Sequence, residues 1–356
     1  MNENPLRALT GHGQSVWLDF ISRELVTTDQ LRNLIANRAV TGMTSNPTIF
    51  QKAVAEGDQY DAQLRELVRA GVTSADDLFV ELAVADIRNA ADTLGAVHES
   101  TGGGDGFISL EVAPDLADDT EATIAAARDL WGRVDRPNLM IKVPATPAGI
   151  PAIERLIADG LNINVTLIFA LSAYETVAEA YIRGLERRAA AGQTLHNRSV
   201  ASFFVSRVDT AVDRLLEERL AQRPDDAELR SLLGTAAIAN AKIAYEAFER
   251  IFRGERFGAL RAAGAAVQRP LWASTSSKNP AYRDVVYAEE LIGPDTVDTM
   301  PLATIEAFAD HGEVRGDTVR EDYSGAHGVI ERLCAVGIEI DTAAIVAAAR
   351  RLAGKD

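Results

Sequence analysis

Cysteine is almost absent from this sequence, and the single residue Cys334 excludes any disulfide bond within the chain of 356 residues. Long apolar runs are absent as well, since no stretch reaches the roughly 18 apolar residues that a membrane-spanning helix needs. The first residues are polar and interrupted by Pro5, Gly11 and Gly13, whereas a secretory signal peptide has an apolar centre. Nothing therefore indicates an oxidising compartment or a membrane, and we expect the protein to be cytoplasmic.

Positive charge is in deficit, because 36 lysine and arginine residues face 52 aspartate and glutamate residues and leave a net charge of −16. Nucleic acids and anionic membrane surfaces are polyanions, so neither is an expected partner of this chain. An anionic substrate would need a local basic pocket that acts against this global field. For the quaternary structure we expect a monomer or a homodimer.

Motifs that bind metals and dinucleotides are missing too. The five histidines form no H-x-x-H or H-E-x-x-H spacing, so the sequence offers no metal site of these types. No G-x-G-x-x-G follows a predicted strand, which argues against a dinucleotide-binding sheet. The glycine cluster Gly102–Gly106 precedes a strand and leads into no helix, so we interpret it as a flexible connector and not as a phosphate-binding loop.

Lysine is scarce even among the basic residues, since only five of the 36 are lysines. One of them, Lys142, lies inside the apolar run Leu139–Val143, which Pro144 closes and which we predict to be a buried strand. A buried, unpaired ammonium lowers its pKa and releases its proton, and the neutral amine is a nucleophile that forms Schiff bases. The alternative is a lysine whose stem packs at a strand end while its head extends to water.

Eight short, nearly continuous apolar segments alternate with helical patterns along the chain, as in a parallel sheet covered on both faces. We predict strands over residues 16–20, 39–44, 107–112, 139–143, 161–169, 200–205, 268–273 and 296–300. We predict helices over 28–38, 73–99, 118–132, 148–159, 172–191, 225–252, 281–292 and 302–311, another ending near 224, and two in the C-terminal segment.

The number of strands and the chain length favour an α/β protein with a closed (β/α)8 TIM barrel and extra helices over an open doubly wound sheet. We find no internal repeat, low-complexity tract or linker that would divide the chain. We therefore expect one domain over residues 1–356, with helical insertions around 47–100 and 207–253 and a C-terminal helical extension around 320–356.

Polar residues recur where the predicted strands end, which is where such barrels carry their chemistry. Each of them alone has a structural explanation, such as capping a loop or filling a strand. Their recurrence near the ends of seven of the eight strands, around a lysine, predicts a site. The residues are Asp19, Asn46, Glu111, Lys142, Asn164, Thr166, Ser202, Arg207, Ser274 and Lys278.

Four segments that contain these residues also resemble segments of the transaldolase family, and they occur in the same order as in the family. Residues 41–50 resemble its T-x-N-P signature, residues 139–149 its Schiff-base lysine segment and residues 162–169 its N-x-T-L-x-F strand. Residues 202–209 resemble the segment that supplies a phosphate-binding arginine. The length and residues 272–279 are most similar to the longer bacterial subfamily.

The resemblance implies a transferase of the non-oxidative pentose phosphate pathway. It would move a dihydroxyacetone unit from sedoheptulose 7-phosphate to glyceraldehyde 3-phosphate, giving erythrose 4-phosphate and fructose 6-phosphate through a lysine Schiff base. The expected partners are thus phosphorylated ketoses and aldoses. No metal and no cofactor is implied, because the imine itself polarises the substrate.

The resemblance also implies catalytic roles for four residues. Lys142 would form the imine with C2 of the ketose, the electron sink that lets the C3–C4 bond break. Asp19 would remove the C4 hydroxyl proton and later return one to the acceptor. Glu111, with Thr166 nearby, would position the water that is released and taken up as the imine forms and hydrolyses.

Substrate binding is implied for the remaining residues. Asn46 and Asn164 would hold the dihydroxyacetone unit, and Ser202 and Phe204 belong to the matching substrate-binding segment. The distal phosphate would be bound by Arg207, Ser274 and Lys278. Many relatives have arginine where this chain has Lys278, and lysine binds phosphate as a point charge without the bidentate fork.

Two other functions compete with this prediction. A class I aldolase of the fructose-6-phosphate aldolase type would release free dihydroxyacetone, but family members of that kind tend to be shorter and lack the glutamate at the position of Glu111. A non-catalytic sugar-phosphate-binding barrel would use Lys142 only as a ligand contact. Borohydride reduction with substrate leaves a covalent adduct only where an imine forms.

Overall fold

In a computed structural model of the protein, eight parallel strands form a closed barrel, each paired with its neighbours in chain order. The structure describes residues 4–45, 47–55 and 57–352. The predicted (β/α)8 architecture is confirmed. The strands are β1 (Gln14–Asp19), β2 (Val40–Thr44), β3 (Ile108–Glu111), β4 (Leu139–Pro144), β5 (Ile163–Ile168), β6 (Ser199–Phe204), β7 (Gln268–Ala273) and β8 (Thr296–Met300).

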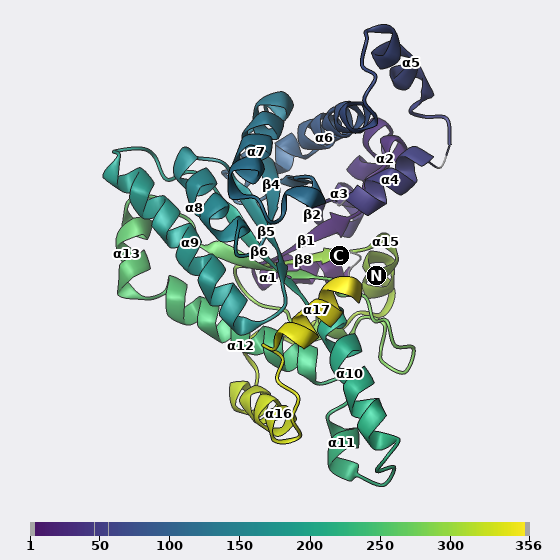
Figure 1. Ribbon diagram of the computed structural model, residues 1–356, viewed down its shortest axis with the longest axis vertical. Helices are drawn as coiled ribbons and strands as arrows, with labels where there is room; N and C mark the ends of the chain where they lie inside the picture. The colour runs from purple at the N-terminus through teal and green to yellow at the C-terminus, as the bar shows by residue number, and fades with distance from the viewer. Residues whose placement is uncertain (1–3, 46, 56, 353–356) are drawn as a thin grey trace.

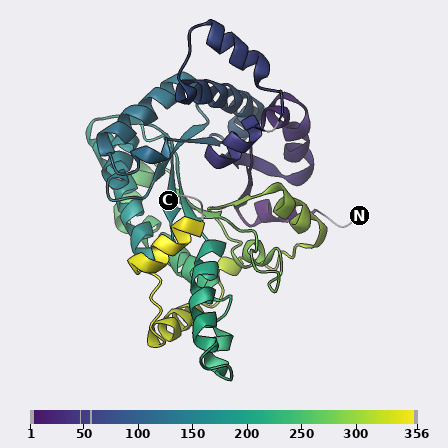
Figure 2. The same ribbon diagram turned by 45° about the vertical axis from the view of Figure 1, so that its right-hand side comes forward.

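Helices surround this barrel, so that each strand has one face toward the barrel interior and the other toward a helix (Figures 1 and 2). Both faces of β4 and β5 are buried, so apolar residues dominate both strands, and the polar residues Lys142, Asn164 and Thr166 are buried among them. The surrounding helices include α3 (Gln30–Arg38), α6 (Ala75–Ser100), α7 (Thr120–Val134), α8 (Gly149–Asp159), α9 (Leu171–Ala190), α10 (Ser206–Leu220), α12 (Ala236–Phe252) and α15 (Leu302–His311).

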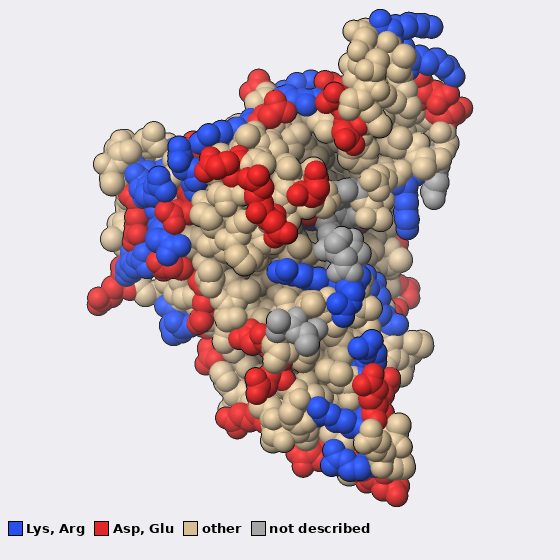
Figure 3. All heavy atoms as spheres, in the orientation of Figure 1, with Lys and Arg blue, Asp and Glu red and all other residues tan. Residues whose placement is uncertain are grey.

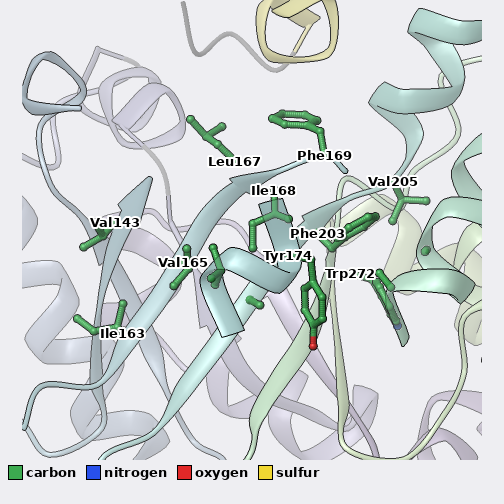
Figure 4. Packing of buried hydrophobic residues seen from close by; sticks show 14 of the residues in the cluster. Val143, Ile163, Val165, Leu167, Ile168, Phe169, Tyr174, Phe203, Val205 and Trp272 are labelled. Atoms are coloured by element: carbon green, nitrogen blue, oxygen red, sulfur yellow. The ribbon is translucent and has the colours of Figure 1, made fainter. Parts of the chain in front are cut away.

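The main hydrophobic core fills the layer between strands and helices. Figure 4 shows part of it, where Tyr174 of α9 packs beside Phe203 of β6 and Trp272 of β7, with the ring centroid of Phe203 6.4 Å from that of Tyr174 and 6.2 Å from that of Trp272. All three side chains are buried. Truncating an aromatic residue of such a layer to alanine typically costs about 3–5 kcal/mol of stability. A second, smaller apolar cluster, which includes Trp17 and Met140, fills the barrel interior.

Further helices extend the barrel. They are α1 (Pro5–Gly11), α2 (Arg23–Thr27), α4 (Pro47–Ala55), α5 (Asp61–Arg69), α11 (Ala227–Ser231), α13 (Glu255–Ala262), α14 (Val286–Glu290), α16 (Tyr323–Ala335) and α17 (Ala343–Leu352). We predicted no helix at α1. The Asn4 side chain accepts a hydrogen bond from the Leu6 N–H and Pro5 occupies the first turn, so the residues that we took as interruptions begin and end this helix.

Two other predicted helices were wrong in detail, and a further helix was not predicted. The helix predicted over 225–252 is divided into α11 and α12 by a turn near Gly234, whose backbone φ is +70°. The helix predicted over 281–292 is limited to α14. Helix α13 was missed, and it has almost no amphipathic pattern by which to find it.

The C-terminal segment lies on the side of the barrel where the strands end. Asp341, just before α17, accepts a hydrogen bond of 2.9 Å from the Ser172 hydroxyl at the start of α9, which follows β5. Helix α17 packs against α10 and α16 against α12, as both views of the ribbon show. The segment therefore adds to the mouth of the barrel and not to its base.

On the face of the molecule that Figure 3 shows, acidic and basic side chains lie close to one another. Figure 3 shows acidic and basic groups mixed over most of one face of the molecule. None of the helices in the described part of the chain is both long enough and apolar enough to cross a membrane.

Candidate active site

The register of the central strands brings three predicted residues into one row. Glu111 of β3 pairs with Lys142 of β4, and Lys142 pairs with Asn164 of β5. Two residues further along β4, Pro144 pairs with Thr166 of β5. Because neighbouring strands are parallel, these side chains lie at the same end of the barrel, as the sequence predicted.

Lys142 is buried, with 7% of its surface exposed, so its head does not extend to bulk water. Its Nζ donates a hydrogen bond of 3.1 Å to the backbone carbonyl of Ser45 and lies 3.7 Å from Oε2 of Glu111. The expectation of an unpaired ammonium was therefore wrong. A carboxylate within this distance compensates part of the cost of burying the charge and also provides an acceptor for its proton.

Asp19, at the end of β1, is held by its neighbour in the sheet. The Thr44 hydroxyl donates to Asp19 Oδ1 at 2.7 Å, and Thr44 Oγ1 is also 2.7 Å from Thr299 Oγ1 of β8. This chain of hydroxyl groups fixes one carboxylate oxygen of Asp19, which restricts its side-chain rotation. A carboxylate with one oriented oxygen is suited to proton transfer in a defined direction.

A second hydrogen-bonded chain runs across β3, β5 and β6. The Ser202 hydroxyl donates to Asn164 Oδ1 at 2.7 Å, and Asn164 Nδ2 donates to Ser109 Oγ at 3.0 Å. All three residues are buried. The contacts fix the orientation of the Asn164 amide beside Lys142, so the amide is in place before any substrate arrives.

A cavity of about 140 Å³ lies at this end of the barrel. Eight of the eleven predicted site residues line it, and Asn164 contacts one of these, Ser202, through a hydrogen bond. The lining includes Asp19, Thr44, Lys142, Thr166, Ser202, Phe204, Arg207, Ser274, Ser276, Lys278 and Thr299. The Thr166 hydroxyl is buried and has no hydrogen-bond partner among the described residues, so it can hold a water or a substrate hydroxyl.

The far side of this cavity is basic. Arg207 lies at the start of α10, and its buried Nε has no hydrogen-bond partner in the described part of the chain. Burial lowers the pKa of Arg207. Burial and the nearby Arg207 charge also lower the pKa of Lys278, whereas Asp19 acts in the opposite direction. Two cations held together in this way are stabilised by an anion between them, which is the local basic pocket that a chain of net charge −16 needs.

Ser274 has a strained backbone at this basic side. Its φ is +60°, in the left-handed region that residues other than glycine adopt rarely. The Ser274 hydroxyl is 3.0 Å from Ser206 Oγ, and its carbonyl accepts from the Ser206 N–H. Strain of about 1–3 kcal/mol persists where the surroundings require it, often at binding sites. This backbone conformation places Ser274 beside Ser206, the first residue of α10.

Several contributors to the site were not predicted from the sequence, and one predicted residue lies outside the described residues. Asn46 falls in the latter group. Thr44 and Ser45 were missed although they belong to the T-x-N-P segment, and Ser276 although it is only two residues from Lys278. Thr299 was missed because we assigned no polar residue to the eighth strand.

The described residues contain no cluster of three or more histidine, cysteine, aspartate or glutamate side chains that could hold a metal ion. The side chains of the site supply an amine, two carboxylates, hydroxyl groups and a basic pocket. That set is suited to imine formation and to proton transfer on a phosphorylated carbonyl compound.

Comparison with known proteins identifies close relatives of this chain. A family model described as transaldolase/fructose-6-phosphate aldolase matches residues 16–352. A transaldolase of Frankia alni is 50% identical over 339 residues, which cover 95% of this chain and 90% of that protein. Transaldolase 1 of Streptomyces avermitilis is 51% identical, covering 94% and 88%, and a transaldolase of Thermobifida fusca is 51% identical, covering 95% and 90%.

Proposed function

The chain belongs to the transaldolase/fructose-6-phosphate aldolase family, and on this premise we propose that it is a transaldolase. It moves a dihydroxyacetone unit from sedoheptulose 7-phosphate to glyceraldehyde 3-phosphate and forms erythrose 4-phosphate and fructose 6-phosphate. The observation that carries the proposal is the buried Lys142 beside Glu111 at a cavity that also contains Asp19. Identity of about half to relatives named transaldolase supports the same activity.

The first step is imine formation at Lys142. The Nζ proton passes to Glu111, 3.7 Å away, and the neutral amine attacks C2 of the ketose. The carbinolamine then loses water, with Glu111 supplying a proton to the departing hydroxyl group. The Thr166 hydroxyl, which has no other partner among the described residues, holds this water.

The second step breaks the C3–C4 bond. Asp19 removes the C4 hydroxyl proton, the C4–O bond becomes the carbonyl of the released aldose, and the bond electrons move into the imine to leave an enamine on Lys142. The enamine adds to the aldehyde of the acceptor, and the proton on Asp19 passes to the new hydroxyl group. Hydrolysis of the imine then releases the product ketose. Asn164, fixed by Ser109 and Ser202, holds the three-carbon unit meanwhile.

The phosphate of donor and acceptor occupies the basic side of the cavity. Arg207, Lys278 and the Ser274 and Ser276 hydroxyl groups line it. The N-terminal end of α10 adds the partial positive charge of its unpaired backbone N–H groups. We propose that Lys278 replaces the arginine of many relatives here as a point charge.

A coupled assay distinguishes this activity from that of an aldolase, the other activity that the family name covers. Fructose 6-phosphate is supplied with and without erythrose 4-phosphate, and glyceraldehyde 3-phosphate is measured by NADH oxidation after isomerisation and reduction. A transaldolase forms it continuously only with the acceptor. Continuous formation without the acceptor, with release of dihydroxyacetone, would identify an aldolase and contradict the proposal.

The proposal also covers the domain organisation, the oligomeric state and the cellular location of the protein. We propose that residues 1–356 act as one domain, a monomer or a homodimer, in the cytoplasm. A net charge of −16 favours small phosphorylated sugars over nucleic acid as partners. Light scattering coupled to gel filtration would measure the mass of the assembly, and a larger oligomer would contradict this part.

A further inference from the structure

A second cavity lies at the opposite end of the barrel, where the strands begin. Its volume is about 540 Å³, within the range of roughly 300–1,000 Å³ that small-molecule sites occupy, and it is larger than the cavity beside Lys142. It is bounded by the starts of β6 and β7, by the connector before β3 and by the segment around α13. None of the proposed catalytic residues lines it.

Four arginines line this cavity: Arg198, Arg253, Arg261 and Arg269. The acidic residue that lines it with them is Asp295. Four guanidinium groups around one cavity form a concentrated positive charge in a chain whose net charge is −16. Such a concentration costs electrostatic free energy unless carboxylates or a bound anion compensate it.

Two of these arginines hydrogen-bond to backbone carbonyls, which carry no formal charge. Within the described residues, Arg198 donates to the Gly103 carbonyl and Arg261 to the Phe252 carbonyl. Arg253 forms an ion pair of 3.0 Å with Glu249, so its charge is compensated.

Arg269 is the innermost of the four and donates to the Ser15 hydroxyl and to the carbonyls of Thr296 and Gly104. Burial lowers the pKa of Arg269, and the charges of Asp105 and Asp295 act in the opposite direction. Asp105 accepts hydrogen bonds from Trp17 Nε1 and from the Ser15 hydroxyl, and Ser15 in turn accepts from Arg269, so the Asp105 carboxylate offsets part of the Arg269 charge. These contacts hold the Arg269 guanidinium rigidly in the wall.

The floor of the cavity is apolar. Trp17, Phe107, Met140 and Val200 contribute to it, and they belong to the cluster that fills the barrel interior. A cavity that combines an apolar floor with arginines on its wall matches a ligand with an apolar body and an anionic group. Several guanidinium groups fit the three oxygens and nearly double charge of a phosphate monoester.

We propose that this cavity is a second ligand site, which binds an organic phosphate with an aromatic or apolar body, such as a nucleoside monophosphate. The site is separate from the phosphate pocket of Arg207 and Lys278, at the other end of the strands. The proposal does not depend on the transaldolase activity.

Isothermal titration calorimetry of the full chain with AMP tests the proposal. We expect one AMP bound per chain, and adenosine and inorganic phosphate each binding at least about ten-fold more weakly, because each lacks one half of the ligand. Absence of AMP binding, or phosphate binding as tightly as AMP, would overturn the proposal.

Matched variants locate the bound AMP. Arg261→Ala should weaken AMP binding about ten-fold or more, whereas Arg256→Ala, on the same helix but paired with Glu179 and Glu186, should leave it unchanged. Ala266→Phe, which fills the cavity from its wall, should weaken binding to a similar degree and serves if Arg261→Ala does not fold. Unchanged binding in the folded Arg261→Ala or Ala266→Phe variant, or binding lost in Lys278→Ala, would refute this location.

Discussion

Glu111 and Lys142 are paired residues on the adjacent strands β3 and β4, and 3.7 Å separates Glu111 Oε2 from Lys142 Nζ. The pairing explains how a lysine is tolerated in a buried strand, because the carboxylate offsets part of the cost of removing its charge from water. The same distance lets Glu111 accept the Nζ proton, directly or through one water, when a carbonyl carbon takes its place. One contact therefore serves both stability and reactivity.

Replacing Glu111 with glutamine tests the second of these roles. Glu111→Gln keeps the size of the side chain but removes the proton acceptor, so imine formation should slow by about 10²–10⁴-fold. The rate of borohydride-trapped adduct formation with fructose 6-phosphate measures this step. Glu121→Gln, on the surface of α7, is the control. Normal trapping kinetics in Glu111→Gln would assign the proton transfer to another group.

Replacing Lys142 with arginine tests the nucleophile itself. Lys142→Arg keeps a positive charge near Glu111, but arginine cannot act as a neutral amine, so turnover should fall to background and no reduced adduct should form. Lys242→Arg is the matched control, since Lys242 is also buried and lies 3.6 Å from Glu290. Mass mapping of the reduced wild-type adduct to a peptide without Lys142 would contradict the assignment.

The barrel and the row of residues around Lys142 could be predicted because both depend on local patterns. Apolar segments define the strands, and the ends of parallel strands necessarily meet at one face. For this reason the sequence alone places Lys142, Glu111 and Asn164 at the same end of the barrel, where the strands pair them.

The details that could not be predicted depend on contacts between distant segments. The left-handed backbone of Ser274 is imposed by its surroundings, since a serine carries no preference for positive φ. Asp19 accepts a hydrogen bond from Thr44, 25 residues away in the chain, and Thr44 in turn contacts Thr299, 255 residues further on. The arginines of the second cavity, at the end of the barrel where the strands begin, meet only because β6, β7 and α13 converge there.

Lys278→Ala should affect substrate binding far more than turnover. The Lys278 ammonium lines the basic side of the cavity with Arg207 and is proposed to contact only the phosphate. A charge-assisted contact contributes roughly 1.5–3 kcal/mol, so kcat/KM for fructose 6-phosphate should fall by about ten- to a hundred-fold or somewhat more, mainly through KM. Lys52→Ala, on α4, is a surface control. An equal loss with unphosphorylated fructose would place Lys278 in another role.

Asp298 should make stability depend on pH. Its side chain on β8 is fully buried, Thr275 donates to Oδ1, and Oδ2 has no partner among the described residues. Burial raises the pKa of Asp298 to about 7, although the Thr275 hydrogen bond lowers it. The folded protein therefore retains this proton up to about neutral pH, whereas the unfolded chain loses it near pH 4.

The sign follows from this difference in proton binding. Between about pH 4 and 7 the folded state binds more protons, so the Asp298 contribution is complete below pH 4 and is lost as pH rises, by up to roughly 1.4 kcal/mol per pH unit. Asp298→Asn cannot ionise and should remove this part of the dependence, becoming more stable relative to wild type at pH 8 than at pH 5. Urea denaturation at the two pH values measures it, and an unchanged difference between the two proteins would refute the role of Asp298.

Asp19→Ala separates imine formation from bond cleavage. Lys142 and Glu111 remain in place in this variant, so the ketose should still form an imine that borohydride traps. Without a base for the C4 hydroxyl proton, cleavage should slow by about 10²–10⁴-fold, and the trapped adduct should contain the intact ketose. Mass spectrometry distinguishes this adduct from the three-carbon one that wild type accumulates.

Two controls test whether the effect comes from the carboxylate at this position. Thr44→Val removes the hydroxyl that holds Asp19 Oδ1 but keeps the base, so its loss of turnover should be smaller than that of Asp19→Ala. Asp29→Ala, which removes an exposed carboxylate paired with Arg32, should not change turnover. If Asp19 only held the lysine in its charged form, Asp19→Ala would alter imine formation and leave cleavage intact. Near-normal turnover, or loss of the trapped imine, would therefore place the base on another residue.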